Sequence, residues 1–476
     1  MTVPLILCSL VLLICIFFSK ALYKFGVPSL LIFLVIGMLF GSDGIVGIKF
    51  ENYELVQQIG SIGLIFIMFY GGFSTNWKAA KPVATKSVLM STLGVIITSV
   101  LTGVFCKFIL KTSTLEGLLI GAVVGSTDAA SVFSILRSRK LNLKNGLASL
   151  LEVESGSNDP MSYMLTITIL SFMSNEAKKQ SIFILICSQI IFGVLVGIVL
   201  AKIVSAILKK VNFEVEGMYP IFVMAIAVLS YSLSEWIGGN GYLSVYICGI
   251  IIGNSKIKHK RSLVSFFDGI SWLMQIMLFF ILGLLSFPSK MPDIIFPAVL
   301  ISLFLIFIAR PIATFGILTW FKVPLKEQIF ISWVGLRGAA SIVFAIFAVT
   351  HKAIIETDIF HIVFFIALFS VSIQGTLIPA LAKKLDLVDD DMPVLKTFND
   401  YKDDFNERLV EVRVTKENKC VNKAIVDLEI PDDILVVLIK RKNMIVHPRG
   451  STVIEDGDVL VVGCNNLDKN YMECFD

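Results

Sequence analysis

Charged residues are scarce in this chain of 476 residues. They make up 16% of the composition, whereas hydrophobic residues make up 56% and the mean hydropathy is +0.83. Soluble globular domains carry about a quarter charged residues, so this composition excludes an ordinary soluble protein and predicts a polytopic membrane protein. The net charge of +4 needs no nucleic acid as a partner, because Lys and Arg concentrate in loops at a membrane surface.

Several sequence signatures are missing. The eight cysteines have no CxxC or other metal-binding spacing and the four histidines are scattered, so neither a disulfide framework nor a zinc site is predicted. No GxxxxGKS/T motif occurs, which argues against nucleotide hydrolysis as an energy source. We expect no cofactor. The N-terminus lacks a basic region and a small-residue cleavage site, so we expect residues 2–19 to be the first membrane helix and not a signal peptide.

Apolar runs of membrane-spanning length recur up to residue 385. We count about thirteen, some of them short: 2–19, 27–42, 55–73, 84–108, 115–136, 147–174, 181–207, 217–237, 241–254, 262–287, 292–320, 327–350 and 357–382. Lys and Arg cluster in alternate loops, as at 137–144, 256–261 and 383–384, whereas Lys49, Lys290 and Lys352 stand nearly alone. By the positive-inside rule this asymmetry predicts a multi-pass cell-membrane protein with its N-terminus outside and its C-terminus in the cytoplasm.

Two segments indicate an internal repeat. Residues 124–131, VGSTDAAS, match residues 334–341, VGLRGAAS, at five of eight positions. Each segment lies in the fifth span of its half, and one extra span separates the halves, so two copies, about 1–175 and 211–385, cross the membrane in opposite directions. Polar or glycine residues interrupt both spans, which predicts helices that unwind and expose backbone groups to a polar ligand.

Ionisable residues surround these interruptions: Asp128, Glu154, Asp159 and Arg337. An unpaired charge at the bilayer centre costs about 3 kcal/mol or more, so these groups should face a cavity or one another. Residues in an α-helix are about 100° apart, so Glu154 and Asn158 lie within about 40° of each other, whereas Asp159 points about 140° away from Glu154. We therefore assign Asp159 to the cavity as the ion carrier and Glu154 to a structural ion pair with Arg337.

A lone carboxylate at Asp159 suggests a coupling mechanism. It holds either a proton or a dehydrated alkali cation, never both, so the two ions compete for one site. Hard cations prefer oxygen ligands, which Asp159, Thr127, Ser155 and freed backbone carbonyls supply. If the site opens alternately to the two sides of the membrane, this competition exchanges a cation for a proton, and the protein is a secondary active transporter and not an enzyme.

Three motifs, taken together and in this order, resemble the signature segments of NhaP-type cation:proton antiporters: Ser126-Thr127-Asp128, Glu154-Ser155-Gly156-Ser157-Asn158-Asp159-Pro160 and Gly335-Leu336-Arg337-Gly338-Ala339. The resemblance covers residues 1–385. It implies a homodimer in which a core domain carries the ion site and moves against a dimerisation domain.

The same resemblance implies roles for single residues. Asp159 is the carboxylate that binds the cation and exchanges the proton, while Asp128 and Thr127 belong to a crossing of two unwound helices. Ser155 contributes an oxygen near the site, and Glu154 pairs with Arg337. Asn158 stands before Asp159 where electrogenic relatives carry a second aspartate, which implies electroneutral exchange.

The composition changes after about residue 386. Residues 386–404 form a polar linker, and residues 405–476 have the pattern of a small cytosolic α/β domain. Strands are predicted at 409–415, 433–443, 444–450 and 458–464. Residues 405–473 resemble the C-terminal domain of regulators of potassium conductance (RCK-C, also called TrkA-C).

That resemblance implies pairing of the domain and a small ligand at the interface of the pair, which in some members is cyclic di-AMP. His447 and Pro448 resemble the contact pair of those binders. The alternative is that His447 is an ordinary residue at a strand end.

Two other classes fit less well. An intramembrane aspartyl protease could use Asp128 and Asp159, but the Gly-x-Gly-Asp context is missing and Arg337 would have no role. A cation channel with the same regulatory domain lacks a TVGYG-like filter, and the inverted repeat favours alternating access. The tail favours K⁺ over Na⁺, and an Na⁺-selective antiporter remains the alternative.

Overall fold

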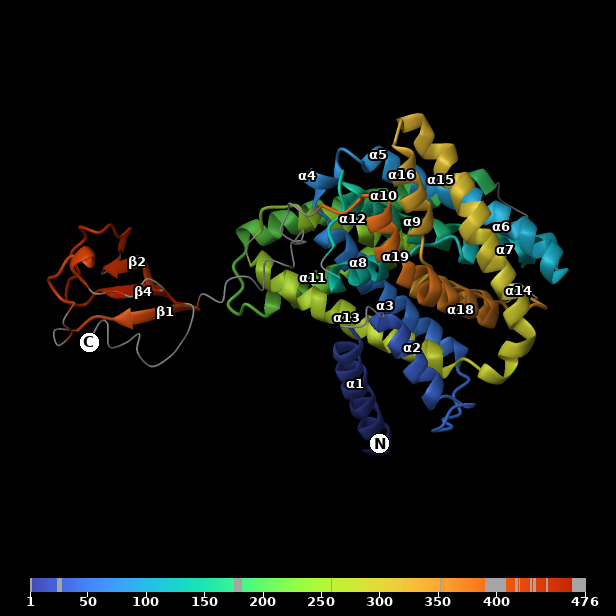
Figure 1. Ribbon diagram of the computed structural model, residues 1–476, viewed down its shortest axis with the longest axis horizontal. Helices are drawn as coiled ribbons and strands as arrows, with labels where there is room; N and C mark the ends of the chain where they lie inside the picture. The colour runs from blue at the N-terminus through green and yellow to red at the C-terminus, as the bar shows by residue number, and fades with distance from the viewer. Residues whose placement is uncertain are drawn as a thin grey trace. The chain divides into compact units, whose positions relative to one another are not determined.

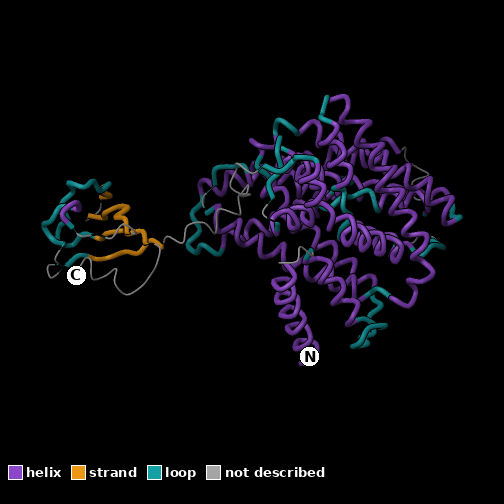
Figure 2. The backbone as a smooth tube through the Cα atoms, in the orientation of Figure 1, coloured by secondary structure: helices purple, strands orange, loops and turns teal. Residues whose placement is uncertain are grey.

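The computed structural model describes residues 2–464 except 24–27, 140, 175–181, 258, 352, 354, 390–407, 416, 417, 419, 429, 431–433, 442 and 443. The chain divides into two compact units, Met1–Leu395 and Lys396–Asp476. The first unit is helical and the second contains the strands (Figures 1 and 2).

The α-helices of the first unit are α1 (Thr2–Tyr23), α2 (Ser29–Phe40), α3 (Tyr53–Ser74), α4 (Trp77–Ala80), α5 (Ala84–Leu89), α6 (Val95–Leu110), α7 (Thr114–Val123), α8 (Ala129–Ser138), α9 (Leu147–Met173), α10 (Ile182–Lys210), α11 (Met218–Trp236), α12 (Gly241–Gly253), α13 (Lys260–Leu284), α14 (Met291–Phe304), α15 (Arg310–Leu318), α16 (Leu325–Trp333), α17 (Ala339–Thr350), α18 (Ile359–Phe369) and α19 (Gly375–Lys384).

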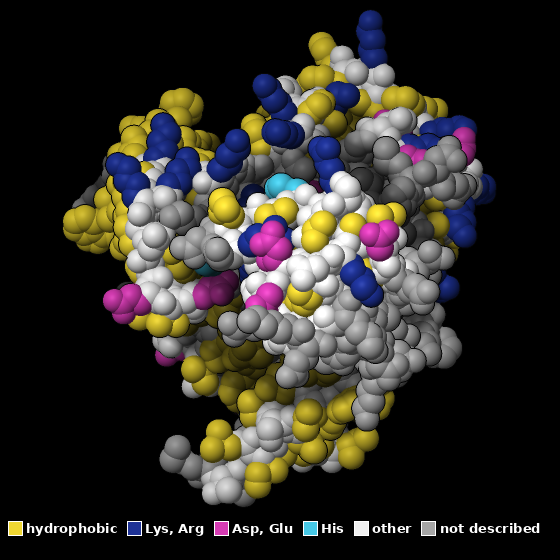
Figure 3. Space-filling model, turned by 90° about the vertical axis from the view of Figure 1, so that its left-hand side faces the viewer, with side chains coloured by type: hydrophobic (Ala, Val, Ile, Leu, Met, Phe, Trp, Pro, Cys, Tyr) yellow, Lys and Arg dark blue, Asp and Glu magenta, His cyan; other side chains and the backbone are white. Residues whose placement is uncertain are grey.

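Seven helical segments among the described residues are long and apolar enough to cross a membrane: Tyr53–Ser74, Ala84–Leu110, Phe183–Lys210, Met218–Trp236, Lys260–Leu284, Ile294–Phe321 and Ile359–Lys384. Large apolar side chains such as Phe108, Phe183 and Trp236 are exposed on this unit, and patches of hydrophobic side chains are visible on the surface in Figure 3. A surface this apolar is typical of a protein that lies in a lipid bilayer.

The helices break at matching places in the two halves of this unit. One π-helical turn, Met90–Gly94, joins α5 to α6, and another, Leu305–Ala309, joins α14 to α15. Likewise α7 and α8 are separated by non-helical residues, as are α16 and α17. A third π turn, Ser370–Gln374, joins α18 to α19. Such turns concentrate at functional sites. The first two occupy corresponding places in the two halves, whereas the third has no counterpart in the continuous helix α9 (Leu147–Met173).

Small residues allow close packing between helices. Helix α2 lies beside α13 (Figure 1). A Cβ atom on Gly37 of α2 would lie 2.1 Å from the carbonyl oxygen of Phe280, and one on Gly283 of α13 would lie 2.1 Å from that of Leu34. The two backbones therefore touch, as small residues permit in membrane helices.

The second unit is a four-stranded antiparallel sheet. Strands β1 (Arg408–Arg413), β2 (Ile434–Arg441), β3 (Met444–Val446) and β4 (Val459–Cys464) lie in the order β1-β4-β2-β3. All four predicted strands are therefore confirmed. The expectation of an α/β domain is wrong for the described part of this unit, where the helical structure is one 3-10 turn, Ile425–Asp427. Alternating apolar residues in the strands favour sheet over helix.

One arginine anchors the end of this sheet. Arg441 donates from Nε to Asp458 Oδ1 (2.9 Å) and from Nη2 to Asp458 Oδ2 (2.8 Å) and the carbonyl of Val453 (2.7 Å). Burial by itself raises the pKa of Asp458, but the hydrogen bonds from Arg441 and the backbone N–H of Glu455 outweigh it and lower the pKa. Asp458 thus stays charged and fixes the turn before β4.

Candidate ion-binding site

The two helix breaks contact each other. The backbone N–H of Asp128, which follows the end of α7, donates to the carbonyl of Leu336, which follows the end of α16, at 2.8 Å. A Cβ atom on Gly338 would lie 2.4 Å from Asp128 Oδ2, so this approach requires glycine. Backbone groups that would be paired inside a helix are therefore gathered at one place in the protein interior.

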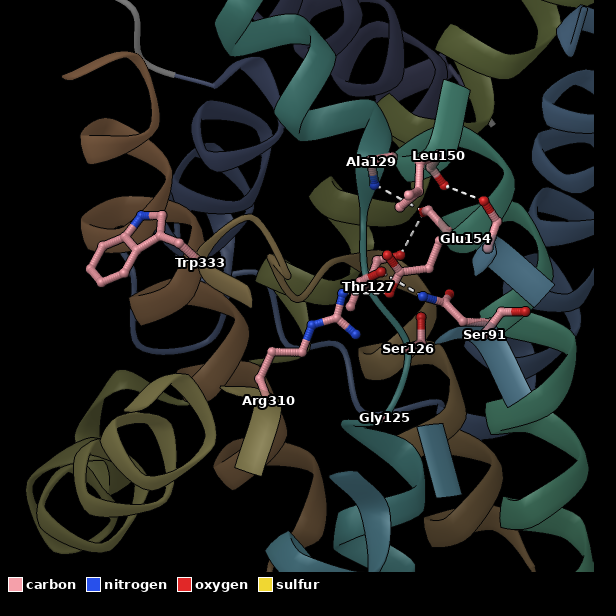
Figure 4. A network of polar contacts seen from close by, with 12 residues as sticks. Ser91, Gly125, Ser126, Thr127, Ala129, Leu150, Glu154, Arg310 and Trp333 are labelled. Atoms are coloured by element: carbon pink, nitrogen blue, oxygen red, sulfur yellow. Dashed lines mark hydrogen bonds and ion pairs between the residues drawn. The ribbon is translucent and has the colours of Figure 1, made fainter. Parts of the chain in front are cut away.

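Three side chains of α9 hold the break between α7 and α8, of which Ser126 and Thr127 are labelled in Figure 4. Ser155 Oγ donates to the carbonyl of Thr127 (2.8 Å) and accepts from the N–H of Ala129 (2.9 Å). Asn158 donates to the hydroxyl of Thr127, and Asp159 accepts from the hydroxyl of Ser126. Asp159 is 8% exposed. The structure therefore brings the predicted residues Thr127, Ser155, Asn158 and Asp159 together.

Asp128 has a local partner at the same break. Its carboxylate accepts from the backbone N–H (3.1 Å) and the hydroxyl (2.6 Å) of Ser131. This contact caps the first turn of α8, where a negative charge is also favoured by the helix dipole. Asp128 thus lies at the crossing, and in this geometry its oxygens serve the helix end.

The ion pair of Glu154 differs from the one predicted. Glu154 accepts from Nη2 of Arg310, and the two side chains are 1% and 3% exposed. Arg337, the predicted partner, instead donates to the carbonyls of Gly125 (2.9 Å) and Ser126 (2.7 Å). The carbonyls after the end of α7 lack helical partners and carry partial negative charge, so they attract a cation.

Arg310 was missed although its signal was visible. It is a lone Arg inside the predicted apolar span 292–320, and a charge there is a candidate functional or paired group. It occupies the first position of α15, directly after the π turn Leu305–Ala309. Figure 4 shows its side chain extending toward Glu154 and Thr127. The pairing partner depends on this turn, which the sequence pattern did not predict.

Several buried polar atoms at the site have no hydrogen-bond partner among the described residues. They are Asn158 Oδ1, Glu154 Oε2, Arg310 Nε and two nitrogens of Arg337, Nε and Nη2. Buried polar atoms are normally paired, and exceptions concentrate where a ligand or water binds. Asn158 Oδ1 is thus a buried oxygen without a described partner next to Asp159.

Two further buried acids were also missed. Glu116, in the first turn of α7, accepts from the N–H of Glu356 (2.9 Å) and the hydroxyl of Thr357 (3.3 Å). Glu327, in the first turn of α16, accepts from the amide of Asn145 (2.7 Å). Each acid thus joins the broken helix of one half to the loop that follows the broken helix of the other half. Their matching positions before the two breaks were the available signal.

The candidate ligand pair of the tail lies in the loop after β3. His447 is exposed and Pro448 is partly buried. The imidazole is therefore accessible from outside the domain.

The fold and the site define a multi-pass membrane protein whose polar centre lies where two broken helices meet. Residues 9–384 match the family model of the transmembrane sodium/hydrogen exchangers, and residues 409–466 match the TrkA-C domain. The chain belongs to the sodium/hydrogen exchanger family, and the resemblance to its NhaP-type members is confirmed.

Individual relatives agree with this assignment. The K⁺/H⁺ antiporter NhaP2 of Shewanella sp. (strain MR-4) is 35% identical over 449 residues, which cover 92% of this chain and 77% of the relative. The K⁺/H⁺ antiporter NhaP of Alkalimonas amylolytica is 40% identical over 365 residues, 76% of this chain and 63% of the relative. The structure of the sodium proton antiporter MjNhaP1 from Methanocaldococcus jannaschii at pH 8 has a TM-score of 0.71 at 26% identity and covers 79% of this chain and 97% of that one.

Proposed function

We propose that this protein is a secondary active antiporter that exchanges a monovalent cation for H⁺ by alternating access. The observation that carries the proposal is Asp159, a buried carboxylate among the oxygens of Ser126, Thr127 and Asn158 where two broken helices cross. One carboxylate that holds either a proton or a cation makes the two ions compete, and that competition couples their movements.

The fold proposal is thirteen spans in two inverted repeats, about 1–175 and 211–385, with an extra span between them. It is supported by the matching breaks: α5–α6 corresponds to α14–α15, and α7–α8 to α16–α17. Helix α10 is the extra span. With an odd number of spans, we place the N-terminus outside and the C-terminus in the cytoplasm, in accord with the Lys and Arg clusters.

We favour K⁺ over Na⁺ and an electroneutral exchange of one cation for one H⁺. Support for K⁺ comes from the relatives named as K⁺/H⁺ antiporters and from the TrkA-C domain. Support for the stoichiometry comes from Asn158, a neutral amide beside the single carboxylate of Asp159. We further propose a homodimer embedded in lipid.

Vesicle transport assays test this proposal. Everted vesicles are acidified inside, and K⁺, Na⁺, Li⁺ or Rb⁺ is added in turn while a pH-sensitive dye reports H⁺ release. We expect release with K⁺ at the lowest half-saturating concentration, and no dependence on an imposed membrane potential. Cation flux without obligatory H⁺ movement would instead identify a channel with a regulatory domain, and preference for Na⁺ would identify an Na⁺-selective antiporter.

We propose that the tail regulates transport and takes no part in the ion path. Support comes from residues 386–389, which precede the tail and contact the loop between α8 and α9. The N–H of Lys144 donates to Leu387 (2.9 Å), and the N–H of Asp389 donates to Asn142 (3.0 Å). This loop leads directly into α9, which carries Asp159, so a displacement of residues 386–389 would be passed on to this helix.

Truncation after residue 390 keeps the contacts that residues 386–389 make with the loop before α9. The truncated protein should therefore retain proton-coupled exchange, with an altered dependence on pH or on a regulatory ligand. The measurement is dye-monitored exchange between pH 6 and 9 for both lengths of chain. Full loss of exchange in a truncated protein that stays folded in size-exclusion chromatography would make the tail part of the transport machinery.

Cyclic di-AMP is our proposed tail ligand, with His447 and Pro448 as contacts. His447→Ala is expected to weaken its binding at least about tenfold, which corresponds to about 1.4 kcal/mol, and to leave exchange without the nucleotide unchanged. Calorimetric titration measures the binding, and His351→Ala serves as a histidine control outside the tail. A full-length protein that does not bind the nucleotide would leave His447 as an ordinary strand-end residue.

A further inference from the structure

One face of α9 presents a row of residues that includes Asp159. Glu152, Gly156, Asp159 and Tyr163 are spaced by four, three and four positions, so they lie on the same side of the helix. Helix α12 packs beside α9 (Figure 1). Asp159 therefore lies along a seam between two helices, while Glu154 points to another side and pairs with Arg310.

A single tyrosine of α12 occupies this seam on one side of Asp159. A Cβ atom on Gly156 would lie 2.4–2.6 Å from the ring and hydroxyl of Tyr246, so the ring lies directly on the α9 backbone. Tyr246 is 3% exposed, and its hydroxyl has no hydrogen-bond partner of good geometry among the described residues. The ring is thus held mainly by its packing on the α9 backbone, and Ser157 and Thr75 are the polar side chains near its hydroxyl.

Three tyrosines, one each from α9, α11 and α12, pack together on the other side of Asp159. The rings of Tyr163 and Tyr242 are 4.8 Å apart and perpendicular, and the rings of Tyr231 and Tyr242 are 4.9 Å apart. Tyr242 stands one helical turn from Tyr246 on α12. Among the described residues, several tyrosine rings thus lie toward the C-terminal end of α9, whereas the tyrosine found toward its N-terminal end is Tyr246.

Exposure along α9 agrees with this difference. Glu152, Ser155, Gly156 and Ser157 are partly exposed, whereas residues 158–164 are buried. The N-terminal end of α9 follows the loop that contacts residues 386–389, which we place at the cytoplasmic surface. Exposure along α9 thus ends near the level of Tyr246, on the side that we place toward the cytoplasm.

We propose that Tyr246 and the pair Tyr242–Tyr163 are the two barriers of the ion path, with Tyr246 on the cytoplasmic side of Asp159 and the pair on the external side. The proposal rests on the antiport function above. An aromatic constriction stops a hydrated ion because the ion must lose water to pass. Rotation of the single Tyr246 ring then opens the cytoplasmic path, whereas the external path opens only when α9 moves relative to α12.

Sided chemical labelling tests these barriers without requiring transport. Asp159→Cys places a thiol between them, and a membrane-impermeant methanethiosulfonate is added to everted or right-side-out vesicles. We expect Tyr246→Ala to raise the labelling rate about tenfold or more in everted vesicles only, and Tyr242→Ala to do so in right-side-out vesicles only, as loss of a constriction on one side predicts.

Matched controls separate a barrier from general loosening. Tyr246→Phe keeps the ring and should leave the labelling rate unchanged. Tyr219→Ala removes an equally buried tyrosine on α11 and also should not change it. Each variant is also labelled without Asp159→Cys to subtract the native cysteines, and Leu replaces Ala wherever the Ala variant does not fold.

The barrier proposal would be overturned if Tyr246→Ala and Tyr242→Ala both left the labelling rate unchanged. It would also be overturned if either variant raised the rate equally in everted and in right-side-out vesicles. Transport is measured separately in the same vesicles with Asp159 intact. Absence of exchange in the wild-type protein would reject the antiport function, whatever the labelling result, so the two failures are distinguishable.

Discussion

Asp159→Asn is expected to reduce proton-coupled cation exchange by about 100-fold or more, because the amide can neither carry the negative charge that holds a cation nor take up and release a proton. The shape of the side chain is nearly unchanged, and its contact with the Ser126 hydroxyl can persist. We therefore expect the protein to remain folded, with a wild-type melting temperature within a few degrees. Dye-monitored exchange with K⁺ and Na⁺ measures the loss.

Asp268→Asn is the matched control for this variant. Asp268 is a partly buried acid of α13 that accepts from the hydroxyl of Tyr70 at 2.8 Å, away from the helix crossing. The same chemical change there should leave exchange within about twofold of wild type, as for a substitution outside the site. Appreciable exchange in the Asp159→Asn variant would remove this carboxylate from the mechanism.

Glu154→Gln is expected to lower stability strongly, because it leaves Arg310 buried without an anion. Breaking a buried pair by removing one partner costs about 3–5 kcal/mol. The expected result is a markedly lower melting temperature in detergent, measured by intrinsic fluorescence or by residual monodisperse protein after heating. An unchanged melting temperature would contradict the importance of this pair.

A second substitution identifies the partner of Glu154. Arg310→Met removes the cation that Glu154→Gln leaves unpaired, and Met is about as long as the aliphatic part of the Arg side chain. The double variant Glu154→Gln/Arg310→Met should therefore regain part of the lost stability. Arg337→Met in place of Arg310→Met should not, because it removes the donor to the carbonyls of Gly125 and Ser126. If Glu154→Gln regained stability with Arg337→Met but not with Arg310→Met, the partner of Glu154 would be Arg337, as first predicted from the sequence.

Local properties of the chain were sufficient to predict much of the architecture. Hydropathy indicated the helical membrane unit, and alternating apolar residues indicated the four strands of the tail, which the structure confirms. The match between residues 124–131 and 334–341 indicated the two breaks, and the motif around Asp159 indicated residues that do lie together. These features could be predicted because each is set by residues that are close together in the sequence or by the preference of a segment for lipid or water.

The tertiary structure decided what contacts what across long separations. Glu154 is 156 positions from Arg310 in the sequence. Its pairing with Arg310 and not with Arg337 depended on the π turn before Arg310 and on the unpaired carbonyls that Arg337 binds. The same is true of Glu116 and Glu327, which join opposite halves, and of Tyr246 on Gly156. By itself the sequence determined where charges and helices occur. Which charges meet was decided only by packing, because the cost of burying a charge depends on the exact partners that the folded helices bring to it.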